Sequence, residues 1–162
     1  LYKEFYGFAM GICLRYTRSS AEASEVLNDG FYKALTHIKT YTPGYSFRGW
    51  LRKIMVNASI DHFRKYKEDH GHVDISYVKS DLLTSEIISH IDEEVILKAL
   101  QELPASYRLV FNLHVIEGYK HDEIAKQLNI SEGTSKSNLN VARTKLQKAL
   151  SQEFERKIIR NG

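Results

Sequence analysis

The sequence is poor in several residues and patterns that mark common protein classes. It has one cysteine and two prolines in 162 residues, and none of its apolar runs approaches the ~18 residues of a membrane span. The lone Cys13 excludes an internal disulfide and a cysteine-based metal cluster, as expected in a reducing compartment. No secretory signal pattern opens the chain. We therefore expect a cytoplasmic protein that is not inserted in a membrane.

What remains of the composition predicts a helical protein. Hydrophobic residues make up 43% of the chain and charged residues 27%, values that are typical of a globular fold. Apolar residues recur every three or four positions almost throughout, and the alternation of a β-strand is scarce. The predicted fold class is all-α. We expect helices over residues 1–16, 22–38, 47–67, 92–103, 106–116, 121–128 and 132–154.

The distribution of charge divides the chain into three parts. Residues 1–67 carry 11 Lys and Arg against 5 Asp and Glu, residues 68–101 carry 2 against 8, and residues 102–162 carry 10 against 7. Residues 68–91 also lack helical periodicity, so we predict two small helical domains, 1–67 and 92–162, joined by an acidic linker. Because Lys and Arg neutralise phosphates locally, two basic domains favour a polyanion as ligand.

Residues 121–132 have the pattern of a helix-turn-helix. Ile124 and Leu128 would face inward on a short first helix, and Asn129 tolerates the left-handed backbone that reverses the chain. Ser131 can then cap a long second helix, which in such a unit lies in the DNA major groove with its first residues at base edges. Side chains expected on its outer face are Thr134, Lys136, Ser137, Asn140, Arg143 and Lys145. A plain helical hairpin with a polar surface is the alternative.

Residues 41–53 alternate four aromatic side chains with three cationic ones. Aromatic faces accept unstacked bases and cations hold phosphates, so this segment and the helix that follows it suit single-stranded nucleic acid. The candidate contacts are Tyr41, Tyr45, Phe47, Arg48, Arg52, Lys53, Asn57 and Arg64. Alternatively, Tyr41, Phe47 and Trp50 serve only as core anchors, which is the interpretation that we favour for Trp50.

An acidic, amide-bearing face is predicted on the helix over residues 22–38, within the otherwise basic first half of the chain. It is formed by Glu22, Glu25, Asn28 and Asp29. Such a face would not attract DNA, but it suits a protein partner that offers Arg or Lys for charge-assisted hydrogen bonds. A plain solvated surface is the alternative.

Taken in their order along the chain, these segments resemble the motifs of bacterial RNA polymerase sigma factors of the extracytoplasmic-function (ECF) group. Residues 22–34 resemble the acidic helix with which the family grips the coiled coil of the β′ clamp. Residues 47–61 are similar to the family's most specific signature, on the helix that melts and reads the minus-ten element. Residues 103–108 and 123–134 resemble the domain that reads the minus-thirty-five element. The resemblance covers nearly the whole chain.

The resemblance implies two small helical domains, sigma regions 2 and 4, in a sigma factor without enzymatic activity. Such a factor binds core RNA polymerase through the β′ clamp and the β flap, and it directs promoter recognition, DNA melting and transcription initiation in an alternative regulon that answers stress or envelope signals. Glu22, Glu25, Asn28 and Asp29 would contact the clamp. The loop at 41–47 and Asn57 would hold an extruded base, and the acidic linker would thread a basic polymerase channel.

The resemblance also implies an anti-sigma factor as a further partner, and it implies no cofactor. The chain departs from the family pattern at several positions. Ser24 stands at a position where the family usually has an acid, Asn28 where it usually has Gln, and Ser135 where it usually has Val.

Two other functions fit parts of the sequence. A helix-turn-helix regulator that acts without polymerase would bind duplex DNA tightly as an isolated chain, whereas a sigma factor needs core enzyme for specific promoter binding. An enzyme would need a metal or catalytic site, and the nearest approach to one is a group of four residues in the predicted linker: Asp69, His70, His72 and Asp74. No pattern of supporting second-layer ligands accompanies them. We therefore predict no catalytic residue and no metal ligand.

Overall fold

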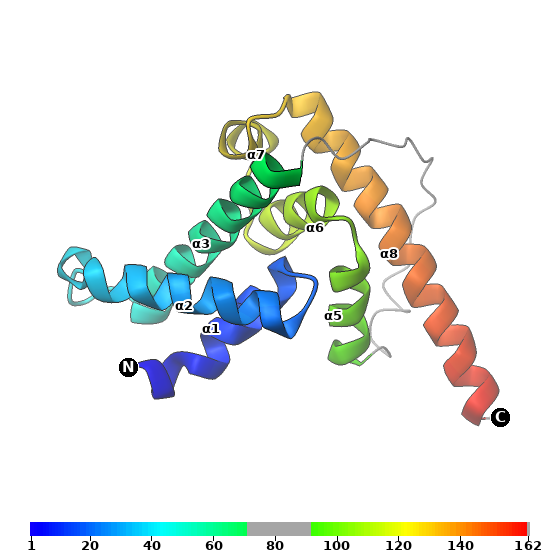
Figure 1. The fold of residues 1–162 in the computed structure, drawn as a ribbon. Helices are drawn as coiled ribbons and strands as arrows, with labels where there is room; N and C mark the ends of the chain where they lie inside the picture. The colour runs from blue at the N-terminus through cyan, green and yellow to red at the C-terminus, as the bar shows by residue number, and fades with distance from the viewer. Residues whose placement is uncertain (71–91, 162) are drawn as a thin grey trace. The chain divides into compact units, whose positions relative to one another are not determined.

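The computed structural model describes the backbone of residues 1–70 and 92–161, and the side chains of residues 1–67 and 92–160. Its Cα positions divide into two compact units, Leu1–His72 and Val73–Gly162. Within the described residues every regular element is a helix and none is a strand (Figure 1). The predicted all-α fold class is therefore confirmed, and the two units are described separately below.

The N-terminal unit consists of three long helices that pack against one another in all three pairs (Figure 1). They are α1 (Tyr2–Tyr16), α2 (Ser20–Thr36) and α3 (Phe47–His70), with a single 3-10 turn, η1 (Ile38–Thr40), after α2. Their buried apolar and aromatic side chains are Ala9, Ile12, Cys13, Tyr16, Ala23, Val26, Leu27, Phe31, Ala34, Leu51, Met55, Val56, Ala58 and Ile60. The core of this unit is thus almost wholly apolar.

Close contact between α2 and α3 depends on a glycine. A Cβ atom at Gly30 would lie 2.4 Å from the Sδ atom of the fully buried Met55, so any side chain at this crossing would force the Met55 side chain to move. The start of α2 is fixed by Ser19, whose Oγ accepts a hydrogen bond from the Glu22 backbone N–H at 3.2 Å. This cap explains why the helix begins at Ser20, ahead of the predicted start at residue 22.

The C-terminal unit consists of shorter helices packed along one long helix. They are α5 (Glu93–Glu102), α6 (Ala105–Phe111), the π-helical turn η2 (Asn112–Ile116), α7 (His121–Leu128) and α8 (Glu132–Asn161). Helix α8 packs against α5, α6 and α7 in turn (Figure 1). One apolar cluster of this unit holds Ala99, Leu100, Leu103, Tyr107, Val141, Ala142, Leu146 and Leu150.

Arg108 lies inside this unit, with 4% of its surface exposed. Its Nε atom donates to the Leu100 carbonyl at 3.0 Å, and its Nη2 atom donates to the carbonyls of Gln101 at 3.0 Å and Leu103 at 2.6 Å. The last carbonyls of a helix have no partner within the helix, and here the guanidinium of α6 supplies one to the end of α5. The buried charge therefore fixes the α5–α6 corner.

The helix bounds agree with the predictions except at a few ends. Helix α3 continues past the predicted end at residue 67 to His70, and α8 continues past residue 154 to Asn161. The predicted helix 106–116 changes to π-type pairing at Asn112, where the side-chain Nδ2 donates to the Arg108 carbonyl at 2.9 Å. A side chain that bonds back to the preceding turn perturbs the backbone ladder of a helix.

Candidate functional site

The turn between α7 and α8 has the predicted helix-turn-helix geometry. Asn129 ends α7 in the left-handed region, with φ 53° and ψ 51°, and it is the one non-glycine residue with positive φ among the described residues. The Ile130 backbone N–H then donates to the Ala125 carbonyl at 3.0 Å. Ser131 Oγ accepts from the Thr134 backbone N–H at 3.0 Å and so caps α8. The predicted turn and cap are confirmed.

The outer face of α8 carries the residues proposed for base contact. Lys136, Asn140, Arg143 and Lys145 are exposed, whereas Thr134 and Ser137 are half-buried. The two hydroxyls are bonded locally, because Ser131 Oγ donates to Thr134 Oγ1 at 2.9 Å and Ser137 Oγ donates to the Thr134 carbonyl at 3.2 Å. An amide and three cations therefore remain accessible along this face of α8.

A polar contact that no sequence pattern indicated joins α7 and α8, the two helices of the helix-turn-helix. His121, the first residue of α7, places its Nδ1 atom 2.8 Å from the Oγ atom of Ser135 in the first turns of α8. The rings of His121 and His114 stack with their centroids 4.3 Å apart and their planes 16° from parallel. His114 Nδ1 lies 2.9 Å from the Tyr119 carbonyl. The two imidazoles thus connect η2, α7 and α8.

The surroundings of His121 disfavour its charged form. Burial lowers the pKa of His121, and positive charge on the stacked His114 ring lowers it further. On α8, Lys136 and Arg143 also lower this pKa, while Glu132 raises it. The net effect is a pKa below the ordinary value for histidine, so at neutral pH the His121 ring is uncharged.

The aromatic residues of the segment 41–53 differ in their exposure. Phe47 packs against Tyr41, Trp50 and Phe5 of α1, with ring centroids 5.3, 5.3 and 4.8 Å away. By contrast, Tyr45 is 76% exposed, and the Tyr41 hydroxyl donates to its carbonyl at 2.8 Å. Tyr41, Phe47 and Trp50 therefore anchor the loop, and Tyr45 presents a free ring to solvent.

The cationic candidates of the N-terminal unit lie along α3 with different neighbours. The Arg48 guanidinium lies 5.3 Å from the centre of the Phe8 ring, in a cation–π contact with α1. Arg64 bonds to Asp61 at 3.2 Å, and Lys33 of α2 bonds to the same carboxylate at 2.7 Å. Among the remaining candidates, Lys53 is exposed, and Arg52 and Asn57 are half-buried.

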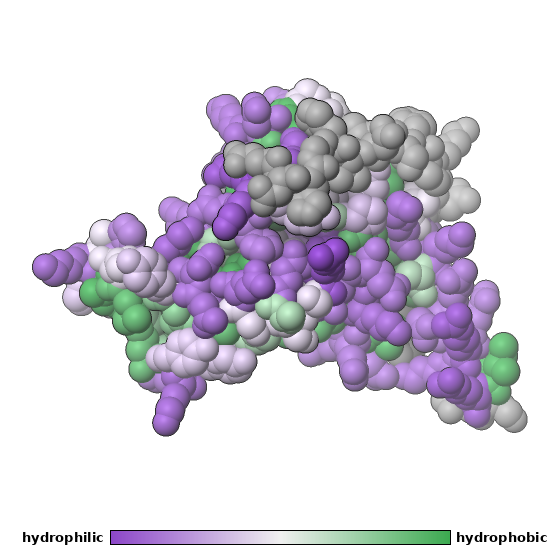
Figure 2. Space-filling model, in the orientation of Figure 1, coloured by the Kyte–Doolittle hydropathy of each residue, from purple (hydrophilic) through white to green (hydrophobic). Residues whose placement is uncertain are grey.

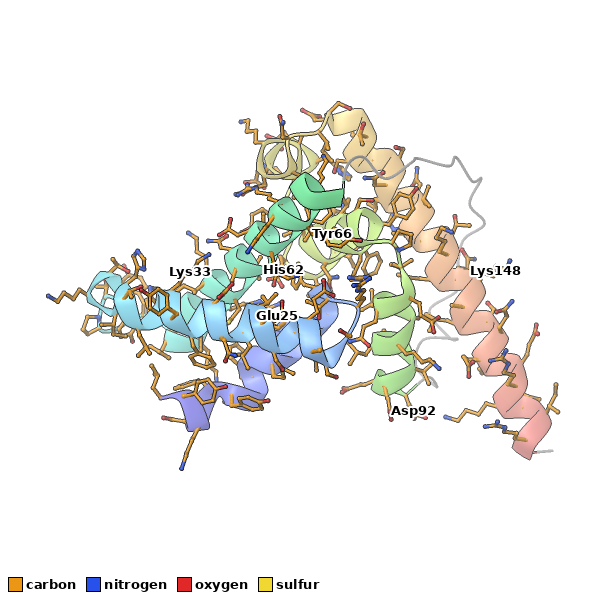
Figure 3. All side chains as sticks on the ribbon, in the orientation of Figure 1. Glu25, Lys33, His62, Tyr66, Asp92 and Lys148 are labelled. Atoms are coloured by element: carbon orange, nitrogen blue, oxygen red, sulfur yellow. The ribbon has the colours of Figure 1, made fainter. Side chains whose placement is uncertain are left out.

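The four residues of the predicted acidic face differ in their exposure and in their partners. Glu25, Asn28 and Asp29 are exposed on α2, but the Glu22 side chain is only 19% exposed. One Glu22 oxygen accepts from the Arg18 backbone N–H at 2.8 Å, and the other lies 3.0 Å from Nε2 of His62 on α3. Figure 3 labels Glu25 on α2 and His62 on α3. Glu22 thus ties α2 to α3.

The visible face of the molecule is mainly hydrophilic (Figure 2). A small apolar area lies in the N-terminal unit where α2 ends, and in this part of the sequence Tyr32, Leu35 and Ile38 are 70%, 59% and 41% exposed. No helix within residues 1–70 and 92–161 combines the length and hydropathy that a membrane span requires.

The described part of the chain brings no three His, Cys, Asp or Glu side chains together as a metal-binding group. The alternative metal site lies outside this part, because the side chains of Asp69, His70, His72 and Asp74 are not among those that the structure describes. The single cysteine, Cys13, is buried in the N-terminal unit, and this burial raises the pKa of its thiol to about 12. A thiol with such a pKa is not a nucleophile at neutral pH.

Comparison with known proteins finds a match for each unit. Residues 1–68 match the family model of sigma-70 region 2, and residues 93–146 match that of sigma-70 region 4. The chain is 28% identical over 152 residues to the ECF RNA polymerase sigma factor SigW of Bacillus subtilis, a match that covers 86% of this chain and 81% of SigW. It is 30% identical over 148 residues to the ECF RNA polymerase sigma factor SigL of Mycobacterium tuberculosis, a match that covers 88% of this chain and 82% of SigL.

The fold is also similar to a solved structure. The sigma factor RpoE of Bartonella quintana, crystallised in complex with the anti-sigma factor NepR, matches with a TM-score of 0.54 and 22% identity, over 92% of this chain and 95% of that chain. Regions 2 and 4 match in their order along the chain, and SigL is 30% identical to it, so the family models and this relative indicate the same family. The chain therefore belongs to the ECF RNA polymerase sigma factors, which are promoter-directing initiation factors and not enzymes.

Proposed function

We propose that the two units of this sigma factor divide the recognition of a promoter between them. The N-terminal unit binds the β′ clamp of core RNA polymerase and the opened minus-ten element, and the C-terminal unit binds the β flap and the minus-thirty-five duplex. The observation that carries this proposal is the helix-turn-helix, in which α8 exposes Lys136, Asn140 and Arg143 beyond a turn fixed by Asn129. The units match sigma-70 regions 2 and 4 in the corresponding order.

The C-terminal unit would read duplex DNA through α8. In a helix-turn-helix the second helix enters the major groove, where Asn pairs with adenine, and Lys or Arg pairs with guanine or holds phosphate. Asn140 and Lys136 lie on the exposed face of α8 close to its start, and Arg143 and Lys145 follow along the helix. Thr134 and Ser137 take part through their local hydroxyl network at the capped end of the helix.

The N-terminal unit would hold a separated strand. The exposed ring of Tyr45 offers a stacking surface for an extruded base, and Asn57 and Lys53 on α3 are placed to contact the strand. Unstacking a base costs a few kcal/mol, which stacking and phosphate contacts must offset. Arg48, Arg52 and Arg64 supply further phosphate contacts, while Tyr41 and Phe47 act through the position of the loop.

The clamp contact would be made by Glu25, Asn28 and Asp29, whose side chains are exposed on α2. Charge-assisted bonds to Arg or Lys of the partner suit this face. Glu22 belongs to the same family motif, but its bond to His62 supports a positioning role between α2 and α3.

Further parts of the proposal concern regulation and cellular context. We propose that the acidic segment 68–91 links the region 2 domain, 1–67, to the region 4 domain, 92–162. The sigma factor would act in the cytoplasm on a stress or envelope regulon. An anti-sigma factor would hold it inactive by covering its polymerase-binding surfaces, an idea supported by the complex in which the related RpoE was solved.

Charge reversal on α2 tests the clamp assignment. The double variant Glu25→Lys, Asp29→Lys should lose core-polymerase affinity by about tenfold or more, because each change replaces an attraction by a repulsion. The matched control Glu4→Lys, Glu155→Lys reverses two exposed acids elsewhere and should bind as the wild type does. Affinity is measured by capture of purified core enzyme, with circular dichroism to confirm folding. Equal capture by both variants would refute the clamp assignment.

A further inference from the structure

The helix-turn-helix contains a pair of histidines that the recognition of bases does not use. His121 begins α7, and its Nδ1 atom lies 2.8 Å from Oγ of Ser135, which is fully buried on the inner face of α8. This polar link joins the first residue of α7 to the first turns of α8. It holds an ionisable ring at the junction of the two helices.

A second histidine stacks against this ring. The His114 and His121 rings lie 4.3 Å apart and nearly parallel. A positive charge on His114 at this distance disfavours a charge on His121. His114 Nδ1 also faces the Tyr119 carbonyl at 2.9 Å, which orients the His114 ring. The two rings therefore form one contact where η2, α7 and α8 meet.

The charged groups that face the pair come from both elements packed against α7. Helix α8 contributes Lys136, Arg143 and Glu132, and η2 contributes His114 itself. Burial and the positive groups outweigh Glu132 and lower the pKa of His121. The His121 ring is therefore uncharged in the free protein at neutral pH.

Bound DNA would instead favour the charged form of His121. In helix-turn-helix complexes the first helix crosses the phosphate backbone while the second lies in the groove, so the start of α7 comes close to phosphates. The same phosphates neutralise Lys136 and Arg143, which disfavour charge on His121 in the free chain. Both effects favour a protonated ring in the complex.

We propose that duplex binding by the C-terminal unit is coupled to the uptake of one proton by His121, whose ring contacts both Ser135 and His114; this coupling rests on the proposed DNA-binding function. His121 is then a positioning residue of the recognition unit and also its proton acceptor. Because the complex holds one more proton than the free components, affinity for duplex rises as the pH falls. One proton can change the affinity by at most about tenfold per pH unit.

The test is the pH dependence of DNA binding by the full chain, alone and with core polymerase. The probe is a labelled 25-base-pair duplex enriched from a random library at pH 7.5, and affinity is measured by fluorescence anisotropy at constant ionic strength. Between pH 7.5 and 6.0 we expect the wild type to gain about three- to tenfold in affinity. His121→Gln, which keeps a hydrogen-bonding side chain but cannot ionise, should lose this gain.

The control is His37→Gln, which removes an exposed histidine of the N-terminal unit and should retain the full pH dependence. Equal pH slopes in the wild type and His121→Gln would overturn this inference and leave the proposed function standing. Absence of binding to any duplex at every pH, with and without core polymerase, would overturn the proposed function and this inference with it.

A measurement on the free chain tests the coupling without DNA. Imidazole proton NMR should show His121 titrating below about pH 6.5, the ordinary histidine value. Titration of His121 at or above that value would overturn the inference, whatever the DNA-binding result.

Discussion

The two units bury polar groups in different ways. Among the described side chains of the N-terminal unit the buried polar residues are Thr17 and Ser59, and each hydroxyl donates to a carbonyl one turn back in the chain. The C-terminal unit buries Arg108, Asn112, Ser135 and Asn138. Of these, Arg108 and Ser135 make contacts with another helix of the unit.

The difference shows how each unit fixes its geometry. Three long helices have enough apolar surface to set their packing by shape, as the contact of Gly30 with Met55 shows. Short helices such as α6 and α7 have less apolar surface. A buried polar group finds its hydrogen-bond partners in only a few arrangements of the helices, so it can fix their geometry. The C-terminal unit therefore depends on directional bonds to hold the corner and the turn that present α8.

The largest effect expected from this difference is at Arg108. Arg108→Leu removes the buried guanidinium that donates to three carbonyls at the end of α5, and it should lower the free energy of unfolding of the C-terminal unit by about 3 kcal/mol or more. Native-state hydrogen exchange resolves the two units, and amides of the N-terminal unit should keep their protection. Arg156→Leu is the control, because this exposed residue pairs with Glu153 on its own helix and should cost less than about 1 kcal/mol. Similar losses from both variants would contradict the comparison.

A smaller effect is expected at Tyr45, where the N-terminal unit separates function from stability. Tyr45→Ala should reduce open-complex formation about tenfold, since stacking contributes about 1–3 kcal/mol per base. It should leave duplex affinity and thermal stability unchanged, because the ring is exposed. Permanganate footprinting of holoenzyme on promoter DNA measures the opened bases. Tyr45→Phe keeps the ring, so a loss equal to that of Tyr45→Ala would exclude stacking as the cause.

The smallest effect is expected at the turn. Asn129→Ala places a residue with a poor tolerance for the left-handed region at φ 53° and should cost about 1 kcal/mol in the C-terminal unit. Asn129→Gly removes the steric penalty and should leave stability nearly unchanged. Urea denaturation compares the two variants with the wild type. If the Asn129→Ala variant has the same free energy of unfolding as the Asn129→Gly variant, the turn is not fixed by backbone conformation.

Features that depend on neighbouring residues could be predicted from the sequence. The bounds of α7, the left-handed Asn129 and the Ser131 cap follow from interactions within a few positions, and all three agree with the structure. The end of α8 was less predictable, because apolar periodicity fades after Phe154. There Lys157 bonds to Asp92 at 3.0 Å, a contact with a residue 65 positions away.

Features that depend on distant residues could not be predicted in the same way. Glu22 resembled its neighbours in the acidic motif, and only the fold brings His62, 40 positions later, within 3.0 Å of it. Similarly, Phe5 joins the cluster that anchors Phe47, which leaves Tyr45 as the exposed ring of the loop. Composition and spacing identify such side chains as candidates, but packing decides which of them reach solvent.

Run-off transcription with purified bacterial core polymerase tests the central claim most directly. The full chain is added to core enzyme on a genomic fragment library, and the 5′ ends of the transcripts are sequenced. The account predicts transcripts that depend on the chain and begin downstream of two shared sequence elements, one for each unit. Failure of the chain to associate with core enzyme at any salt concentration, or to change which sites are transcribed, would contradict it.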